Sequence, residues 1–220
     1  VFAAIALNPQ VTVQMLTKRP ERMLEYISSL RGVKLRSGLI RLRNQLEGIQ
    51  DARYTELTED LLPLKNLHLG VSVENQKVAD DRIPLLLKTP AALRFLSVEP
   101  LLESLDLTES DGMYNPGLGE GHTWLNPLAG IAYDSDGSFS STPAIDWAII
   151  GGESGPGARP CDINWIGSIL KQCQSSRVPA FVKQLGSNPV NLGSEGKLRD
   201  RKGGSIAEWP EHLRVREFPV

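Results

Sequence analysis

Cysteine is scarce in this chain, and that scarcity excludes two classes of protein. The 220 residues contain only two cysteines, Cys161 and Cys173, about a dozen positions apart. A secreted disulfide scaffold needs several pairs, and a structural zinc site needs cysteines or histidines at close spacing. The sequence therefore favours two reduced thiols in a cytoplasmic protein, with no metal site built on them.

Long apolar runs and an excess of charge of one sign are also absent. No segment approaches the roughly 20 apolar residues of a membrane helix, so we expect no membrane contact. The formal net charge is −2, which leaves no overall positive field to attract nucleic acid. The basic run at 197–202 is typical of a solvated loop, and contact with nucleic acid there is the weaker alternative.

What the chain does have is an alternation of strand and helix patterns. Apolar runs rich in β-branched residues predict strands at 11–17, 67–73, 93–98, 147–151 and 180–184. Helical patterns occupy 1–7, a segment starting at Pro20, 35–49, 75–88 and 162–175. This alternation predicts parallel strands joined by right-handed crossovers within one α/β domain.

Two segments break this rhythm. Residues 106–145 are rich in glycine and serine, and we expect them to form a long irregular insertion on the surface. Residues 186–220 form a glycine-rich, charged tail that packs on the preceding part or extends from it. The chain starts at Val1, without an initiator methionine and with a helical pattern already under way, so we expect a fragment whose first part is absent.

A glutamate follows each of three predicted strands. The strings Ser-Val-Glu end at Glu74 and again at Glu99, about 25 residues later, and a third apolar run ends at Glu153. In α/β folds the carboxyl ends of parallel strands are where ligands bind. We therefore expect these carboxylates to face a common site, although acids also favour the first turn of a following helix.

The faces of the strands support the same prediction. Side chains alternate along a strand, so Ser72 shares a face with Glu74, and Ser97 shares one with Glu99. Fully covered parallel strands are continuous apolar runs, and these strands are not. Buried charges must be paired, bound to a metal or solvated. A ligand-holding cavity inside a barrel or half-barrel explains the pattern, with His68 as a hydrogen-bonded inner residue rather than a metal ligand.

The loop at 151–157 contains glycine or proline at five of its seven positions. It lacks the lysine of a phosphate-binding loop and the glycine spacing of a dinucleotide site, so its nucleotide signal is weak. Bare backbone suits a close approach to a ligand. We expect Gly151 and Gly152 to make that approach.

Several strings in the same order along the chain also resemble one known family. They are the residues at 16–23, 69–74, 94–102, 150–160, 182–184 and 200–210. Together they are similar to an uncharacterised phage-associated family whose members carry a three-cysteine motif and are considered radical-SAM-like. The similarity covers nearly the whole chain.

The resemblance implies a radical-SAM-like fold and two cofactors. The fold is a partial (β/α) barrel of parallel strands over 1–185, with the insertion 106–145, and it lacks the first strands. The cofactors of the complete protein are S-adenosylmethionine and a [4Fe-4S] cluster, held by cysteines that this chain does not contain. We therefore expect this chain alone to bind no cluster and to be inactive.

The resemblance also suggests roles for the strand-end residues. Those expected at the cofactor are Ser72, Glu74, Ser97, Glu99, Gly151, Gly152 and Glu153. Those expected at an anionic substrate group are Lys18, Arg19, Lys183 and Gln184.

Two other functions fit the same residues. The first is an accessory protein that binds a metabolite or nucleotide without turnover. The second is an enzyme in which Glu74, Glu99 and Glu153 are oxygen ligands of a divalent metal. The substrate and the oligomeric state stay open.

Overall fold

A five-stranded sheet forms the centre of the protein in a computed structural model, which describes residues 1–30, 37–38, 40–41, 62–108, 124–134, 136–193 and 198–219. The strands are β1 (Val13–Thr17), β2 (Leu67–Ser72), β3 (Leu93–Val98), β7 (Trp147–Gly151) and β9 (Ala180–Gln184). Their order in the sheet is their order in the chain, and each neighbouring pair is parallel. The predicted strands and their parallel arrangement are therefore confirmed.

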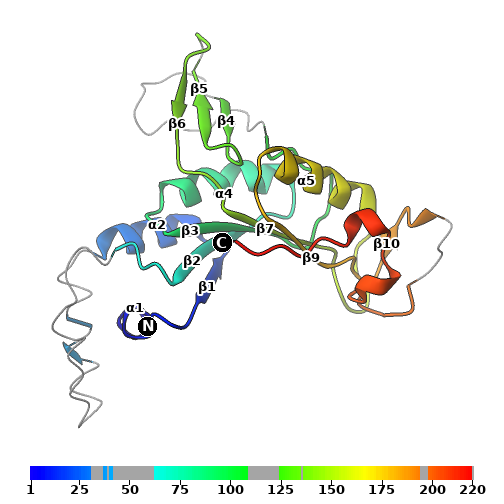
Figure 1. The fold of residues 1–220 in the computed structure, drawn as a ribbon, viewed down its shortest axis with the longest axis horizontal. Helices are drawn as coiled ribbons and strands as arrows, with labels where there is room; N and C mark the ends of the chain where they lie inside the picture. Colours follow the sequence, from blue (N-terminus) through cyan, green and yellow to red (C-terminus); the bar gives the residue numbers. More distant parts are fainter. Residues whose placement is uncertain are drawn as a thin grey trace.

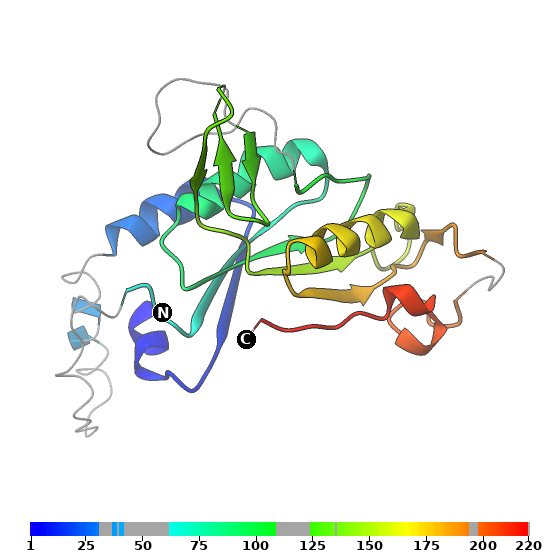
Figure 2. The ribbon, with the colours of Figure 1, turned by 45° about the horizontal axis from the view of Figure 1, so that its top comes forward.

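Three helices cover one face of this sheet (Figures 1 and 2). They are α2 (Pro20–Ser29), α4 (Gln76–Lys88) and α5 (Ile163–Ser175). Right-handed crossovers between successive strands that never reverse direction across the sheet put every helix on the same side. A (β/α) barrel is built from the same units, but β1 and β9 do not pair among the described residues. The sheet described is therefore open, and the barrel itself is not shown.

Local sequence explains where these helices begin. Pro20 occupies the first turn of α2, where its missing N–H costs nothing. The side chain of Asn75 accepts a hydrogen bond from Val78 N at the start of α4, and Asp162 does the same for Asn164 N at α5. These caps satisfy backbone donors that would otherwise lack partners.

The core lies between the sheet and the helices. Leu69, Val71, Leu96 and Ile150 point to the helix-covered face and are completely or almost completely buried. They pack with residues such as Ile83 of α4. One apolar face of the sheet thus supplies most of the hydrophobic stabilisation.

The opposite face of the sheet carries an aromatic cluster. Phe95, Trp147, Phe181 and Phe218 lie in consecutive contact, with ring centroids 5.2–6.2 Å apart. The C-terminal segment 214–219 runs antiparallel along the outer edge of β9, where Val182 N donates to Val215 O. This segment brings Phe218 onto the cluster and covers one edge of the sheet.

The insertion contains more structure than its composition indicated. Its described part forms an antiparallel sheet of β4 (Trp124–Asn126), β5 (Ile131–Tyr133) and β6 (Phe139–Ser141). We call residues 124–134 and 136–141 the arm, which projects from the helix-covered side in Figures 1 and 2. The interpretation of 106–145 as irregular missed these strands, because each has only three residues.

The remaining elements are short. They are α1 (Phe2–Leu7), β8 (Cys161–Asp162) paired with β10 (Pro189–Val190), and the short 3-10 helices Ile206–Glu208 and Glu211–Leu213. The helix predicted at 35–49 falls mostly outside the described residues. Among the helices described, none combines the length and apolarity needed to cross a bilayer.

Candidate functional site

The carboxyl ends of the five strands bring the predicted polar residues into one line. Ser72 of β2 is the register partner of Ser97 of β3, so Glu74 and Glu99 follow as neighbours two residues later. Lys18 directly follows β1 on one side. On the other side Gly151 ends β7, and Lys183 is the next-to-last residue of β9. We call Lys18, Glu74, Glu99, Gly151 and Lys183 the strand-end row.

Glu74 is the most firmly held carboxylate of the strand-end row. It is 8% exposed and forms ion pairs with Lys18 and with Arg82, whose Nη1 lies 3.2 Å from Oε2. The same Arg82 nitrogen donates to Ser72 O at 2.8 Å. Arg82 is half-buried on α4, so it fixes Glu74 at the end of β2, while the Lys18 side chain is 62% exposed.

Glu99 is held more loosely. Its side chain is 16% exposed, and its Oε2 lies 3.4 Å from Nζ of Lys183, which is 58% exposed. Its other oxygen lies over Gly151, where an added Cβ would be only 2.6 Å from Oε1. Among the described residues Glu99 therefore has one counterion, at a long distance and on a side chain open to solvent.

Glu153 is occupied by a neighbouring arginine. Arg159 donates from Nε to Oε2 and from Nη2 to Oε1, each at 2.8 Å, and its backbone N donates to Oε2 at 2.9 Å. These hydrogen bonds, first from the side chain and then from the backbone, lower the pKa of Glu153 to about 2. The charge of Glu74 also contributes to raising the pKa of Arg159, which places the Glu153–Arg159 pair near the strand-end row.

Ser72 and Ser97 lie just before the glutamates on the same face of the sheet. The two residues are 3% and 5% exposed, and no described residue forms a hydrogen bond with either hydroxyl, so both hydroxyls keep some contact with solvent. Two small hydroxyl groups side by side leave hydrogen-bonding capacity next to Glu74 and Glu99.

The glycine-rich loop packs against this chain's own backbone. A Cβ on Gly152 would lie 2.3 Å from Leu185 O, and one on Gly186 would lie 2.7 Å from Glu153 O. Gln184 Nε2 donates to Gly152 O at 3.0 Å. The close approach predicted at Gly151 and Gly152 is thus made by Glu99 and by the segment after β9, and contact with an adenosyl group stays a prediction.

Arg19 is the predicted residue that the structure places elsewhere. It lines a separate groove of about 390 Å³ beside β1, together with Met15 and Tyr26. Sequence reasoning in turn missed Arg82 and Arg159, the partners of Glu74 and Glu153. The signal for Arg82 was its place eight residues after Glu74, on the helix that follows the strand.

His68 differs from its prediction as a hydrogen-bonded residue. Its Nδ1 is buried and has no hydrogen-bond partner. Burial lowers the pKa of this imidazole, and the charge of Asp146 raises it by a smaller amount. No other polar side-chain atom of the described residues is buried without a partner.

The described residues do not fit an iron–sulfur cluster. Cys161 lies on β8 and Cys173 on α5, both are buried, and burial raises the pKa of each thiol to about 12. Cluster ligation needs several thiolates close together. Across the described ranges, no three histidine, cysteine or acidic side chains are placed to hold a metal ion, so the divalent-metal alternative gains no support.

A family profile with the description "Protein of unknown function (DUF5131)" matches residues 1–209. The chain belongs to the DUF5131 family. No curated protein and no solved structure matches it. Membership in DUF5131 confirms the resemblance at the level of an uncharacterised family, and its description names no activity, so function is argued from the strand-end row.

Proposed function

We propose that the strand-end row binds a small polar molecule. This molecule carries a carboxylate and, in addition, a positively charged group or hydroxyl groups. The ligand implied by the family resemblance is S-adenosylmethionine. The observation that carries the proposal is the state of Glu99: a largely buried carboxylate whose one described counterion, Lys183, is 3.4 Å away and 58% exposed.

Such a pair is easily opened. An ion pair with an exposed lysine contributes only about 0–1 kcal/mol to stability. A ligand ammonium or hydroxyl group that replaces Lys183 at Glu99 therefore displaces little, and it restores a partner to a carboxylate that is mostly removed from water. Lys183 is then free to pair with a ligand carboxylate.

The same residues suit S-adenosylmethionine in particular. Its amino-acid part carries an ammonium and a carboxylate, its ribose carries hydroxyls, and its sulfonium is positive. Glu99 supplies the negative partner, Lys183 the positive one, and Ser72 and Ser97 supply hydroxyl groups without described partners. Because the described residues hold no cluster ligands, the proposal concerns binding and includes no reaction step.

Calorimetric titration of the purified chain with S-adenosylmethionine tests the proposal. We expect Glu99→Gln to weaken binding roughly tenfold, which corresponds to about 1.4 kcal/mol. Glu21→Gln removes an equal charge from an exposed position on α2 and should leave affinity unchanged. Binding that is equal in Glu99→Gln and the unmodified protein, or absent at millimolar ligand, would sink the proposal.

Titration with AMP addresses the accessory-protein alternative. A nucleotide offers phosphate to Lys18 and Lys183 but no ammonium to Glu99. Binding of AMP that is weakened by Lys183→Met and unaffected by Glu99→Gln would favour that alternative.

A further inference from the structure

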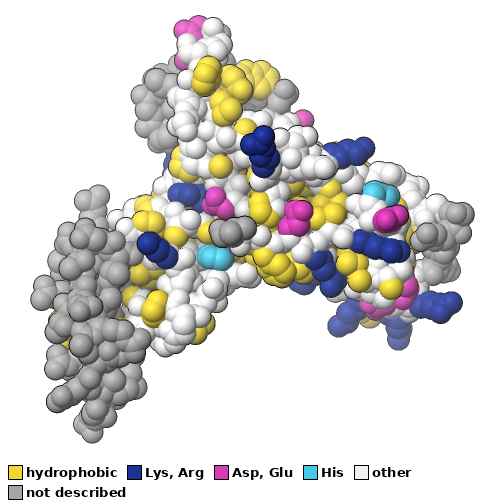
Figure 3. Space-filling model, in the orientation of Figure 1, with side chains coloured by type: hydrophobic (Ala, Val, Ile, Leu, Met, Phe, Trp, Pro, Cys, Tyr) yellow, Lys and Arg dark blue, Asp and Glu magenta, His cyan; other side chains and the backbone are white. Residues whose placement is uncertain are grey.

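Three aromatic side chains line up on the exposed face of the arm. Trp124, Tyr133 and Phe139 are register partners across β4, β5 and β6, so they share one face. They are 47%, 38% and 75% exposed. We call them the aromatic row, and Figure 3 shows hydrophobic side chains at this projecting end of the molecule. Contiguous exposed apolar groups of this kind mark interaction sites.

The arm is acidic at the turn beside the aromatic row. Asp134 and Asp136 lie between β5 and β6, and residues 124–141 contain no lysine or arginine. Hydrogen bonds with the Asp134 and Ser138 side chains, in that order, lower the pKa of Asp136 to about 2, and the same contact with Asp136 raises the pKa of Asp134. The turn is therefore negative at neutral pH, and a partner for the arm needs an apolar surface with positive charge around it.

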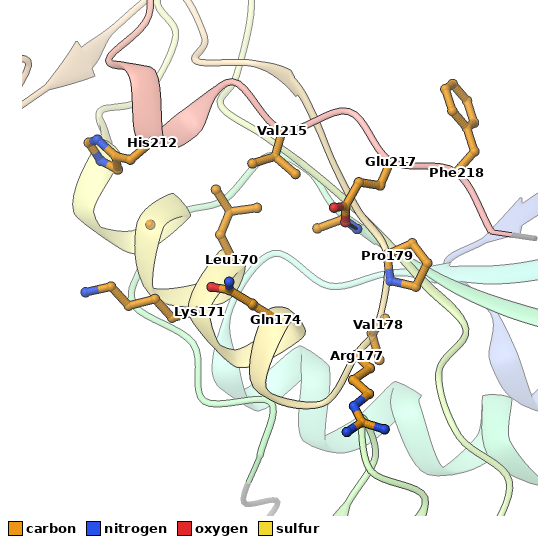
Figure 4. Close-up of a pocket in the computed structure, with 12 residues that line it drawn as sticks. Leu170, Lys171, Gln174, Arg177, Val178, Pro179, His212, Val215, Glu217 and Phe218 are labelled. Atoms are coloured by element: carbon orange, nitrogen blue, oxygen red, sulfur yellow. Dashed lines mark hydrogen bonds between the residues drawn. The ribbon is translucent and has the colours of Figure 1, made fainter.

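This chain has such a surface on another part of the molecule. A groove of about 750 Å³ lies between α5 and the C-terminal segment (Figure 4). This volume is within the range of ligand-binding clefts, roughly 300–1,000 Å³. The apolar lining residues of the groove are Leu170, Val178, Pro179, Ala180 and Val215.

The edges of the groove carry two cations, Lys171 and Arg177. Lys171 and His212 lie at one end and Arg177 at the other (Figure 4). None of these three side chains forms an ion pair or hydrogen bond with another described residue. The one acid of the lining, Glu217, already accepts a hydrogen bond from Ala180 N at 3.1 Å.

We propose that the arm of one copy of this protein docks into the groove of a second copy. The aromatic row fills the apolar groove, and Asp134 and Asp136 face the cations at its edges. Aromatic side chains bury large areas on docking, and complementary charges orient the partners. Within one chain the arm points away from the groove, so the contact forms only between copies (Figures 1 and 2).

The contact joins two different surfaces of the protein, the arm and the groove. Two kinds of assembly can follow from such a contact. If each copy both offers its arm and receives its partner's, the pair closes as a symmetric dimer. If the geometry does not close, the same contact continues into larger oligomers. In either case association depends on the same residues of the arm and the groove, and it weakens as salt screens the charges.

Analytical ultracentrifugation of the full chain over a concentration series tests this inference. We expect mass to rise with concentration, and Phe139→Ser or Lys171→Glu to raise the dissociation constant at least roughly tenfold. The double variant Asp136→Lys with Lys171→Glu reverses both charges and should regain most of the association lost in either single variant. Circular dichroism checks that each variant is folded.

Two matched substitutions serve as controls. Val11→Ser removes an exposed apolar side chain far from the arm, and Lys65→Glu reverses an exposed charge outside the groove. Neither should change association. A chain that stays monomeric up to roughly 0.2 mM at low salt overturns the proposal, as does association that Phe139→Ser and Lys171→Glu leave unchanged. Both outcomes are independent of ligand binding at the strand-end row.

Discussion

Glu99 and Gly151 are packed so closely that any side chain at position 151 must displace the carboxylate. A Cβ there would lie 2.6 Å from Glu99 Oε1 and 3.1 Å from Gln184 O. The first neighbour is the end of a flexible side chain, and the second is backbone. The glycine therefore leaves the room that the Glu99 carboxylate occupies, and the binding proposal rests on that carboxylate.

The first prediction compares two adjacent glycines. Gly151→Ala should cost about 1 kcal/mol of stability, because Glu99 can move, and should weaken ligand binding as Glu99→Gln does. Gly152→Ala should cost about 3 kcal/mol, because the new methyl group would lie 2.3 Å from the backbone oxygen of Leu185. Urea unfolding measures both values.

Gly167→Ala is the control for these two substitutions. Its new methyl group finds no atom closer than 3.9 Å, and alanine favours the helical conformation of α5 by roughly 0.5–1 kcal/mol over glycine. This variant should be slightly more stable than the parent. Equal losses at positions 151 and 152 would contradict the packing described at the two sites.

The second prediction concerns acid stability and the Glu153–Arg159 pair. The pKa of Glu153 in the folded protein is about 2, below its usual value of 4.5. A carboxyl group with a lowered folded pKa contributes stability above its unfolded pKa, and this contribution is lost as pH falls from about 4.5 to about 2. Glu153→Gln should therefore show a smaller fall in melting temperature between pH 5 and pH 3.

Exposed acids provide the comparison. Glu21→Gln removes a carboxylate from the first turn of α2, where no described residue forms an ion pair with it. It should change the pH dependence less than Glu153→Gln does. The same pH dependence in Glu153→Gln and the parent protein would show that the Arg159 pair does not persist in solution.

The sequence predicts the long strands, which depend on patterns along the chain, better than the short strands and the contacts across the fold. The strands Leu93–Val98, Trp147–Gly151 and Ala180–Gln184 were predicted with their observed bounds, because short segments rich in apolar residues are followed there by glycine or proline within two residues. The strands of the arm were missed, because three residues such as Trp124–Asn126 give no measurable period.

The site was predictable only in outline. Alternation along β2 and β3 placed Glu74 and Glu99 on one face, because register follows from the side-chain period of two. Their counterions depend on distances across the fold. Arg159 reaches Glu153 through the intervening loop, in which Gly155 and Gly157 have positive φ, and no pattern in the sequence indicates its path.

The third prediction is that both thiols are inert in the folded protein. Burial is the main cause that raises the pKa of Cys161 and of Cys173 to about 12, so the reactive thiolate is negligible at pH 8. Iodoacetamide at pH 8 should leave the native chain unmodified and should label both cysteines in urea. Mass spectrometry distinguishes the products, and rapid labelling of one thiol without denaturant would show that its site opens to solvent.

The last prediction concerns His68, whose Nδ1 is buried without a hydrogen-bond partner. Burial lowers its pKa from the usual 6.5, so the folded protein binds a proton here less readily than the unfolded chain does. The contribution of His68 to the stability of the folded protein is therefore lost as pH falls through the pKa that this histidine has in the unfolded chain. His68→Leu should make urea unfolding less dependent on pH between 7.5 and 5.5, and should not weaken the protein at pH 7.5. A larger loss of stability at pH 5.5 in His68→Leu than in the parent would show that the imidazole gains a partner when protonated, and the charge of Asp146 makes that residue the candidate.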